Sequence, residues 1–120
     1  MKNAKYWFCV VILLLSNFVV SAYDFSKEGI YYEFNDSDWE GLTVAVTRKG
    51  SAKQQTGAYG GRVVIPSSVS YKGNTYRVSE IKGEAFAGCS ELTSIVIPNS
   101  VSRIGNGAFR DCSKLTAVDI

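Results

Sequence analysis

The sequence predicts a mostly β protein in which an N-terminal β cap precedes a short solenoid whose coils share a parallel sheet. The first observation is an internal repeat: IKGEAFAGCSELTSIVIP begins at Ile81, and IGNGAFRDCSKLTAVDI begins at Ile104, 23 positions later. A fixed period of this size is typical of stacked units that bury their apolar faces against each other. The second is that the strand-like segments before the repeat have no copy elsewhere. The predicted organisation is a signal peptide at 1–22, a β cap at 23–61 and coils at 62–120, the last incomplete.

The N-terminal segment has the pattern of a secretory signal peptide. Lys2 and Lys5 give a positive start, an apolar run follows, and Val20 and Ala22 are small residues suited to cleavage before Tyr23. An uncleaved membrane anchor is the alternative, but the uninterrupted apolar run is shorter than the roughly 20 residues that span a bilayer. We therefore expect a secreted or cell-surface protein that is not inserted in a membrane after cleavage.

Removal of the signal also removes the net charge. The chain has 13 Lys and Arg and 11 Asp and Glu residues, and Lys2 and Lys5 belong to the signal, so the mature chain carries 11 of each. A neutral chain without a clustered basic stripe lacks the electrostatic footprint of a nucleic-acid or anionic-lipid binder. We expect neither partner.

The cap is predicted from two strand-like segments, GIYYEF and LTVAVT, which NDSDWEG connects. Terminal units of a solenoid need such a cover for their first apolar face. The first coil then begins with VVIPSSV, which resembles IVIPNSV of the later copy. Between them, SYKGNTYRV predicts an inserted β-hairpin with Gly73-Asn74 in a type II′ turn.

Within one repeat, Leu92, Ile95 and Ile97 follow the L-x-x-L-x-L spacing that forms a short strand with inward apolar side chains. Pro98 ends that strand because it cannot donate to a ladder. The arc that follows predicts a short helical or 3₁₀ turn, with Gly105 at a corner of positive φ. The predicted repeat core consists of Phe86, Cys89, Leu92, Ile95, Ile97, Ile104, Phe109, Cys112, Leu115 and Ile120.

The pattern I-x-x-x-A-F-x-x-C-x-x-L-T-x-I-x-I-P-x-S-V-x-x-I-G, read from Ile81 onward, resembles the BspA-like or treponemal-type leucine-rich repeat. The resemblance implies a curved solenoid with its parallel sheet on the concave side. It also implies interaction rather than catalysis, because members of this family are bacterial surface proteins associated with adhesion. The implied partner is a protein of the host matrix or of another cell's surface.

The composition limits the chemistry. Histidine is absent, which excludes Ser-His and Cys-His nucleophilic systems and histidine metal sites within this chain. Cys89 and Cys112 are too few for a zinc site, and they are either a disulfide between adjacent coils or, as we expect, two buried free thiols. DSDWEG resembles the opening of a calcium loop, but Thr47 stands where the bidentate carboxylate would be, so a solvated turn is favoured. We expect no enzyme activity, no metal and no cofactor.

The outward side chains of the repeat strands are the candidate interaction face, and the alternative is an inert surface of small residues. A different functional class is a carbohydrate-binding or envelope-structural module that uses aromatic residues of the cap. A third alternative is the targeting module of an enzyme whose catalytic domain lies beyond this chain. The candidate interaction residues are Thr93, Ser94, Val96, Thr116, Ala117 and Asp119, and the candidate glycan-stacking residues are Trp39, Tyr31, Tyr32 and Tyr59.

The second copy of the repeat stops at Ile120, where the first copy continues with Pro98. Solenoids of this kind generally need about three or more repeats for stability. The sequence therefore predicts the N-terminal part of a longer solenoid, and an isolated chain that is marginally stable or self-associates through its open C-terminal coil.

Overall fold

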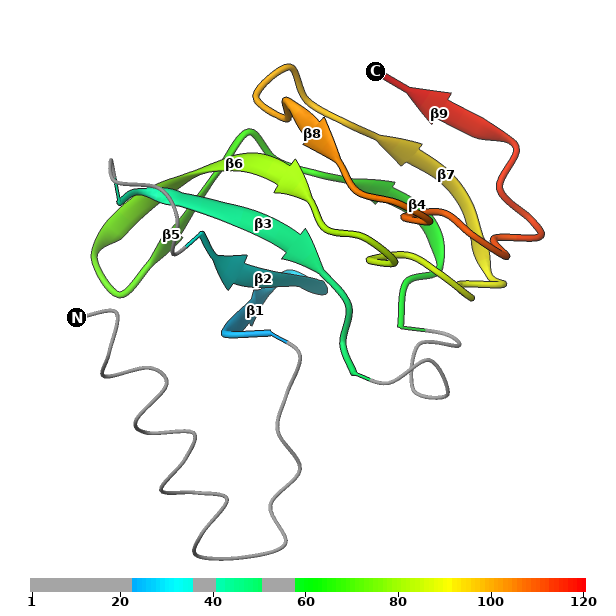
Figure 1. Ribbon diagram of the computed structural model, residues 1–120, viewed down its shortest axis with the longest axis horizontal. Helices are drawn as coiled ribbons and strands as arrows, with labels where there is room; N and C mark the ends of the chain where they lie inside the picture. The colour runs from blue at the N-terminus through cyan, green and yellow to red at the C-terminus, as the bar shows by residue number, and fades with distance from the viewer. Residues whose placement is uncertain (1–22, 36–40, 51–57) are drawn as a thin grey trace, which may run out of the picture.

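The computed structural model describes residues 23–35, 41–50 and 58–120, which form nine strands in two sheets (Figure 1). The predicted signal peptide and the acidic turn of NDSDWEG lie outside these residues. The strands are β1 (Phe25–Lys27), β2 (Ile30–Phe34), β3 (Thr43–Thr47), β4 (Gly61–Val64), β5 (Ser68–Tyr71), β6 (Asn74–Ile81), β7 (Leu92–Val96), β8 (Arg103–Ile104) and β9 (Ala117–Asp119).

The larger sheet joins the cap to the coils. Its order is β1-β2-β3-β6-β5, and β8 pairs with β6. Strands β3, β6 and β8 run parallel to one another, with Val46 opposite Ile81 and Ile81 opposite Ile104, whereas the β1–β2, β2–β3 and β5–β6 pairs are antiparallel. The cap strand β3 is thus related to β6 in the same way as β6 is related to β8.

The smaller sheet, β4-β7-β9, is wholly parallel, and its central row is Val63, Ile95 and Val118. Each coil leaves the larger sheet, passes through an arc and enters the smaller sheet, as the paths from β6 to β7 and from β8 to β9 show in Figure 1. The predicted mostly β solenoid with a parallel sheet of repeat strands is confirmed.

The arcs are runs of turns, and the described residues contain no helix, so the predicted helical or 3₁₀ pieces are wrong. Positive φ values at Glu84 (61°) and Gly88 (75°), repeated one period later at Gly107 (65°) and Asp111 (60°), interrupt any helix. Successive amides of the arc between β6 and β7 alternately donate hydrogen bonds within their own coil and to the next coil. Ala85, Ala87 and Cys89 donate to carbonyls three residues earlier, whereas Glu84, Phe86 and Gly88 donate to carbonyls of the next arc.

The predicted hairpin between the first two coils is present, but its turn lies one residue earlier than predicted. Tyr71 pairs with Asn74, so Lys72 and Gly73 are the central residues. Both have positive φ, 48° and 84°, which is the type I′ combination rather than type II′. The twist of this turn matches that of the flanking strands.

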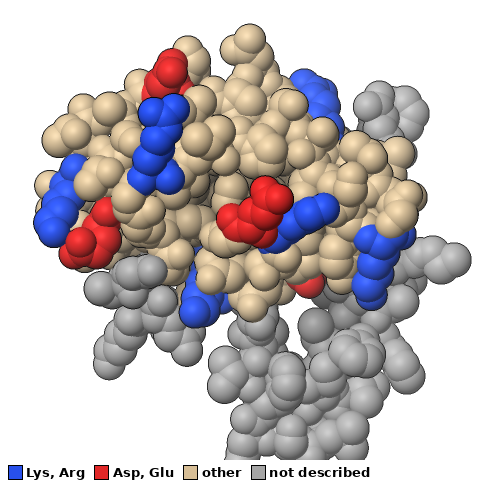
Figure 2. Space-filling view, turned by 180° about the vertical axis from the view of Figure 1, so that it is seen from behind, with Lys and Arg blue, Asp and Glu red and all other residues tan. Residues whose placement is uncertain are grey.

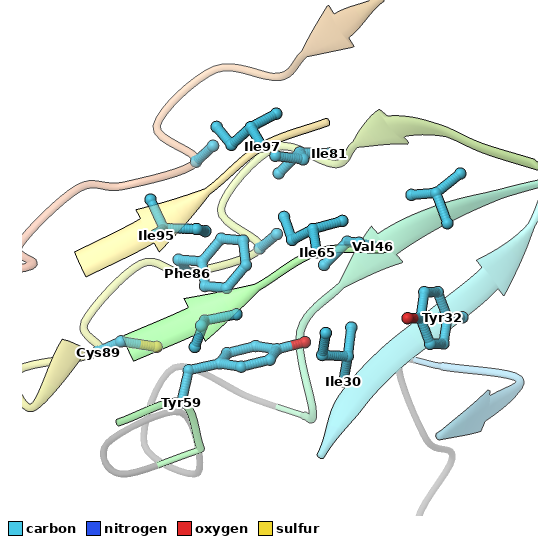
Figure 3. Close-up of a cluster of buried hydrophobic side chains, with 14 of the residues drawn as sticks. Ile30, Tyr32, Val46, Tyr59, Ile65, Ile81, Phe86, Cys89, Ile95 and Ile97 are labelled. Atoms are coloured by element: carbon cyan, nitrogen blue, oxygen red, sulfur yellow. The ribbon is translucent and has the colours of Figure 1, made fainter. Parts of the chain in front are cut away.

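Burial of the predicted repeat-core residues differs between the first and the second copy of the repeat. Phe86, Cys89, Leu92, Ile95 and Ile97 are buried, and Figure 3 shows four of them between the two sheets. Phe109, Cys112 and Leu115, one coil later, are only partly buried. Ile104 is 44% exposed and Ile120 is 80% exposed, which departs from the prediction, because burial of each repeat position requires a following coil.

A column of aromatic rings crosses the boundary between cap and coils. Tyr31 meets Tyr59 edge-on at 5.5 Å between ring centroids, Tyr59 meets Phe86 at 4.5 Å, and Phe86 stacks on Phe109 at 5.3 Å. The Tyr59 hydroxyl donates to the Thr47 carbonyl at 2.8 Å and accepts from the Tyr31 amide at 3.0 Å. The Tyr59 side chain therefore connects β2, β3 and the segment between β6 and β7 that contains Phe86 (Figure 3).

A second aromatic group fastens the inserted hairpin to the cap. The Phe25 ring stacks on Tyr71 of β5 at 4.1 Å and on Tyr32 of β2 at 5.1 Å. Phe34 lies 5.2 Å from Tyr76 of β6. The hairpin thus covers the apolar side of the cap, as an insert placed at the start of a stack should.

The Gly105 corner does not have the predicted positive φ. Glycine is needed there because of a close backbone approach: a Cβ at Gly105 would lie 2.6 Å from the Cα of Gly83 and 2.9 Å from the carbonyl carbon of Lys82. A Cβ at Gly83 would lie farther from its neighbours, 3.1 Å from the Asn106 carbonyl oxygen and 3.6 Å from the Asn106 amide nitrogen. The shift of glycine by one position between the two copies therefore lets the two corners pack against each other.

We predict that Gly105→Ala destabilises the protein by about 1–3 kcal/mol, the usual cost of forcing extra atoms into a packed site. Gly83→Ala is the matched control, and it should cost clearly less because its shortest new contact would be 3.1 Å. Urea unfolding followed by far-UV circular dichroism measures both. Equal midpoints for the two variants would contradict the close approach.

We predict that Tyr59→Phe lowers the free energy of unfolding by about 1–3 kcal/mol, because the buried Thr47 carbonyl and the partly buried Tyr31 amide lose their partner. Tyr76→Phe, at a partly buried ring, should change it by less than about 0.5 kcal/mol. Denaturant titration of both variants gives the comparison. The column would not connect cap and coils as described if Tyr59→Phe behaved like its control.

Candidate binding surface

The side of the β4-β7-β9 sheet that points away from the core is a regular surface formed by three parallel strands, and we call it the outer face. Its first row runs from Arg62 of β4 through Ser94 of β7 to Ala117 of β9. Its second row consists of Val64, Val96 and Asp119. All six residues are exposed or partly exposed, and Val64 is 54% exposed.

A bulge makes this face. Gly61 pairs with Leu92, but the next residue, Arg62, pairs with Ser94, so Thr93 is an extra residue without an opposite partner in β4. The bulge allows Leu92 and Ile95, three positions apart, to point into the core while Thr93 remains exposed. The L-x-x-L spacing of the repeat thus has a direct physical cause in the strand.

The structure places four of the six predicted interaction residues, Ser94, Val96, Ala117 and Asp119, in the rows of the outer face, and the other two, Thr93 and Thr116, directly before its first row. Thr93, Thr116, Ala117 and Asp119 are exposed, and Ser94 and Val96 are partly exposed. Sequence reasoning missed two further members, Arg62 and Val64. The signal was present, because aligning VVIP with IVIP places Arg62 opposite Ser94 and Val64 opposite Val96.

The chemistry of the outer face is that of a contact surface. Its centre has valine and small side chains, a basic group stands at the start of the first strand, and a carboxylate stands at the end of the last strand. Short side chains permit close approach of a partner, but they are poor hot spots individually. Affinity would have to come from several rows acting together.

A charged groove lies where β3 and β6 end, and its lining includes Arg48, Lys82 and Glu84. Arg48 already contacts Glu84 at 3.4 Å, and Lys82 contacts Glu80 at 3.8 Å. These side chains are between 17% and 42% exposed, so the pairs are largely solvated and individually weak. The charges balance within the groove, which gives it no strong preference for an anion or a cation. On the face in Figure 2, acidic and basic side chains are likewise interspersed.

A second groove lies between the cap and the first coil. Its apolar lining comes from Ile30, Tyr32, Val64, Pro66 and Val69, and its charged lining residues are Lys27 and Glu28. Val64 belongs both to this groove and to the outer face. The two surfaces are therefore continuous at strand β4.

Most of the aromatic residues considered for glycan stacking are buried or packed against other rings. Tyr32 is 1% exposed and Tyr59 is 2% exposed, so neither ring offers a face to a sugar. Burial, with a smaller effect of Glu28, raises the pKa of Tyr32 to about 12, and burial raises the pKa of Tyr59 still further. Tyr31 lies between Tyr23 and Tyr59. Trp39 lies outside the described residues.

Cys89 and Cys112, the two cysteines within the described residues, do not form a disulfide. Cys89 is buried, and Cys112 is partly buried and donates its S–H to the Phe86 carbonyl at 3.0 Å. Burial raises the pKa of Cys89 to about 11 and also raises that of Cys112. Thiols protonated at neutral pH are poor nucleophiles and poor metal ligands. Across the described ranges, no cluster of three or more cysteine and carboxylate side chains could hold a metal ion.

In residues 23–35, 41–50 and 58–120, no helix has the length and apolar character needed to cross a membrane.

Residues 64–120 match the family model described as the BspA-type leucine-rich repeat region (6 copies). Among solved structures, a leucine-rich repeat protein from Bacteroides ovatus is similar at 38% identity and a TM-score of 0.67, over 82% of this chain and 24% of that one. A leucine-rich repeat protein from Bacteroides capillosus is similar at 27% identity and a TM-score of 0.61, over 79% of this chain and 63% of that one.

A leucine-rich cell surface protein from Faecalibacterium prausnitzii shares the fold at 24% identity and a TM-score of 0.62, over 85% of this chain and 24% of that one. No curated protein matches the chain. The chain spans about a quarter of the B. ovatus and F. prausnitzii proteins, at 24% of each.

We predict that iodoacetamide at pH 8 modifies Cys112 before Cys89 and modifies both slowly. With a pKa of about 11, Cys89 is a thiolate in about one molecule in a thousand at that pH. Mass spectrometry follows the reaction, and urea should make both thiols reactive. Two thiols that react at the rate of an unfolded peptide, or a native mass lower by two hydrogens, would contradict the structure.

Proposed function

The chain belongs to the BspA-type leucine-rich repeat family, and we propose that it is an exported, non-enzymatic protein-binding module of a bacterial cell surface. The observation that carries this proposal is the outer face, whose six residues stand in two regular rows. None of these side chains is buried in the core. A surface that the fold does not use is available for a partner.

A binding role rather than catalysis is supported by the chemistry of the described residues. The chain has no histidine, and burial keeps both thiols in the protonated form. The carboxylate of Glu84, the central acidic group of the charged groove, is held between Arg48 and Arg110. These groups contribute to coil packing and lack the nucleophile-and-base arrangement of covalent catalysis.

Export is supported by the signal-like N-terminal sequence, which has two lysines, an apolar run and small residues before Tyr23. The similar protein from F. prausnitzii is named as a cell surface protein, which is consistent with the same location for this chain. The partner that we propose is a protein of the host matrix or of another cell's surface. Such a partner would lie along the rows of the outer face and interact with Arg62 at one corner and Asp119 at the other.

The outer face is tested by Val64→Glu, which puts a charge at the β4 edge of the face, in the row of Val96, on a side chain that is already 54% exposed. We expect binding to immobilised collagen, laminin or fibronectin, or to intact host cells, to fall by about tenfold or more, because a buried unpaired charge is costly at an interface. Thr75→Glu, exposed on the inserted hairpin, is the matched control and should bind as the unmodified protein does.

Circular dichroism must show that both variants are folded. The proposed face would be wrong if Val64→Glu and Thr75→Glu bound equally well to a probe that the unmodified protein binds. Absence of binding of the unmodified protein to every matrix protein and cell type tested would contradict the adhesive role itself.

Export is tested by determining the N-terminus of the protein recovered from the cell surface or the medium. We expect the mature chain to begin at Tyr23, because cleavage should follow Ala22. Recovery only from the cytoplasm with Met1 or Lys2 at the N-terminus would contradict export.

A further inference from the structure

The groove between the cap and the first coil, which we call the cap groove, has an unpaired strand edge along one side. Its volume is about 480 Å³. Strand β5 contributes Ser68 and Ser70 to its lining, and this strand has no neighbour on its free side within the described residues. The apolar lining residues are Ile30, Tyr32, Val64, Pro66 and Val69.

The pairing of β5 with β6 shows which backbone groups of β5 are free to bind. In an antiparallel ladder, hydrogen-bonded pairs alternate with pairs whose backbone groups point away from each other. Ser68 is opposite Arg77, and the Arg77 amide donates to the Leu42 carbonyl at 2.9 Å, on the side away from β5. Ser68 therefore belongs to a pair of the second kind, and so does Ser70, two residues later. The N–H and C=O groups of both serines point to the free edge.

A contact across the cap groove supports this direction. The Ser70 carbonyl accepts a hydrogen bond from Lys27 Nζ of β1 at 2.9 Å. Strand β1 is the opposite edge of the same sheet, and the sheet curls so far that Phe25 of β1 stacks on Tyr71 of β5 at 4.1 Å. Side chains, not a ladder, join these two edges. The Lys27 side chain is exposed, so it can release the carbonyl to another donor.

Strand β5 lacks the usual protection of an exposed edge. Its sequence, Ser-Val-Ser-Tyr, contains no proline and no charge, and its register with β6 has no bulge. Natural sheets usually interrupt such edges, because a free edge pairs readily with another chain. A regular edge beside an apolar groove is suited to strand addition, in which the main chain provides affinity and the side-chain pockets provide specificity.

From these features we propose that the cap groove binds an extended segment of the partner protein, which adds to β5 as a further strand. The amides and carbonyls of the segment pair with those of Ser68 and Ser70, and its apolar side chains, at every second position, contact the apolar lining. This inference rests on the proposed protein-binding function and extends it, because Val64 belongs to both the cap groove and the outer face.

The charge beside β5 sets a further requirement on the segment. Lys27 Nζ contacts Ser70, and Lys72 Nζ lies 5.4 Å from the centroid of the Tyr71 ring. Both groups are ammonium ions at the hairpin end of β5, so a carboxylate of the segment is the complementary group there. A second copy of this chain, paired edge to edge through β5, would instead bring the same lysines together.

The test begins with a phage-displayed library of random peptides, selected on the exported protein and then synthesised. Fluorescence anisotropy measures their affinity for the unmodified protein, for Ser70→Pro and for Ser70→Thr. Proline removes the outward amide at position 70 without breaking the ladder, because that amide does not pair with β6. Threonine retains the amide and is the matched control. Circular dichroism compares the folding of the variants.

We expect the selected peptides to have apolar residues at alternate positions and at least one Asp or Glu. Ser70→Pro should weaken their binding by about tenfold or more, and Ser70→Thr by less than about twofold. N-methylation of the peptide should weaken binding at alternate positions only, because every second amide of an added strand faces its neighbour. This pattern needs no variant of the protein, so it decides the question even where Ser70→Pro does not fold. Replacement of the peptide carboxylate by an amide should matter clearly less for Lys27→Gln than for the unmodified protein.

Equal affinity for Ser70→Pro and Ser70→Thr, N-methylation effects that do not alternate, or a selection that yields no binding peptide would overturn the proposal. A dimer of the unmodified protein that Ser70→Pro dissociates would also overturn it, since a second copy would then occupy the edge.

Adhesion assays separate this proposal from that of the outer face. If Val64→Glu lowers binding to immobilised collagen, laminin or fibronectin and Ser70→Pro does not, the outer face stands and strand addition to β5 is overturned. If peptides bind as described but the exported protein adheres to no matrix protein and no host cell, the adhesive role fails and the cap groove stands.

Discussion

The structure depends on one column of aromatic rings that passes through the interior of the stack. Tyr59, Phe86 and Phe109 occupy the same place in successive coils, with centroid separations of 4.5 and 5.3 Å. The column fixes the distance between the two sheets, since each ring fills the space that an arc encloses. Tyr59 adds what phenylalanine cannot, because its hydroxyl satisfies a carbonyl of β3 and an amide of β2. The cap is thereby held in register with the coils.

This interior arrangement explains why function has to be sought on the surfaces. Alternate amides of the arc between β6 and β7 bond within their own coil and to the next coil, and the apolar side chains of that coil point inward. The polar and small side chains that remain are displayed at the strand spacing on the outer face. Such a scaffold can vary its surface residues with little effect on the core, which is the property that a recognition protein requires.

The sequence predicted the parts of the fold that are local and periodic. The 23-residue spacing identified the strands, the inward positions of Leu92, Ile95 and Ile97, and the strand end at Pro98. The sequence could not show that β3 pairs with β6, because the cap strand has no copy of the repeat motif. It also could not show that Tyr59 takes the place of the repeat phenylalanine, because Tyr59 does not lie 23 residues before Phe86. Burial of Ile104 and Ile120 could not be judged from their own residues, since it depends on the coil beside them.

The candidate site was predictable to a similar degree. The alternation of the repeat strand gave the predicted residues of the outer face, whereas Arg62 and Val64 required the pairing of β4 with β7. The glycan alternative failed at Tyr32 and Tyr59 because aromatic content does not distinguish a ring in a core from a ring on a surface. The turn at Lys72 and Gly73 was misplaced by one residue because several neighbouring residues tolerate a hairpin turn.

Native-state hydrogen exchange as a function of urea concentration tests most directly the claim that the aromatic column makes cap and coils one cooperative unit. Amides of β3 and β7, on opposite sides of the column, should lose their protection together, at the urea concentration where the whole protein unfolds. Amides of β9 should exchange at lower urea concentrations, because β9 is an edge strand. Loss of protection in β3 while β7 remained protected would show that the cap opens independently, which would contradict the account.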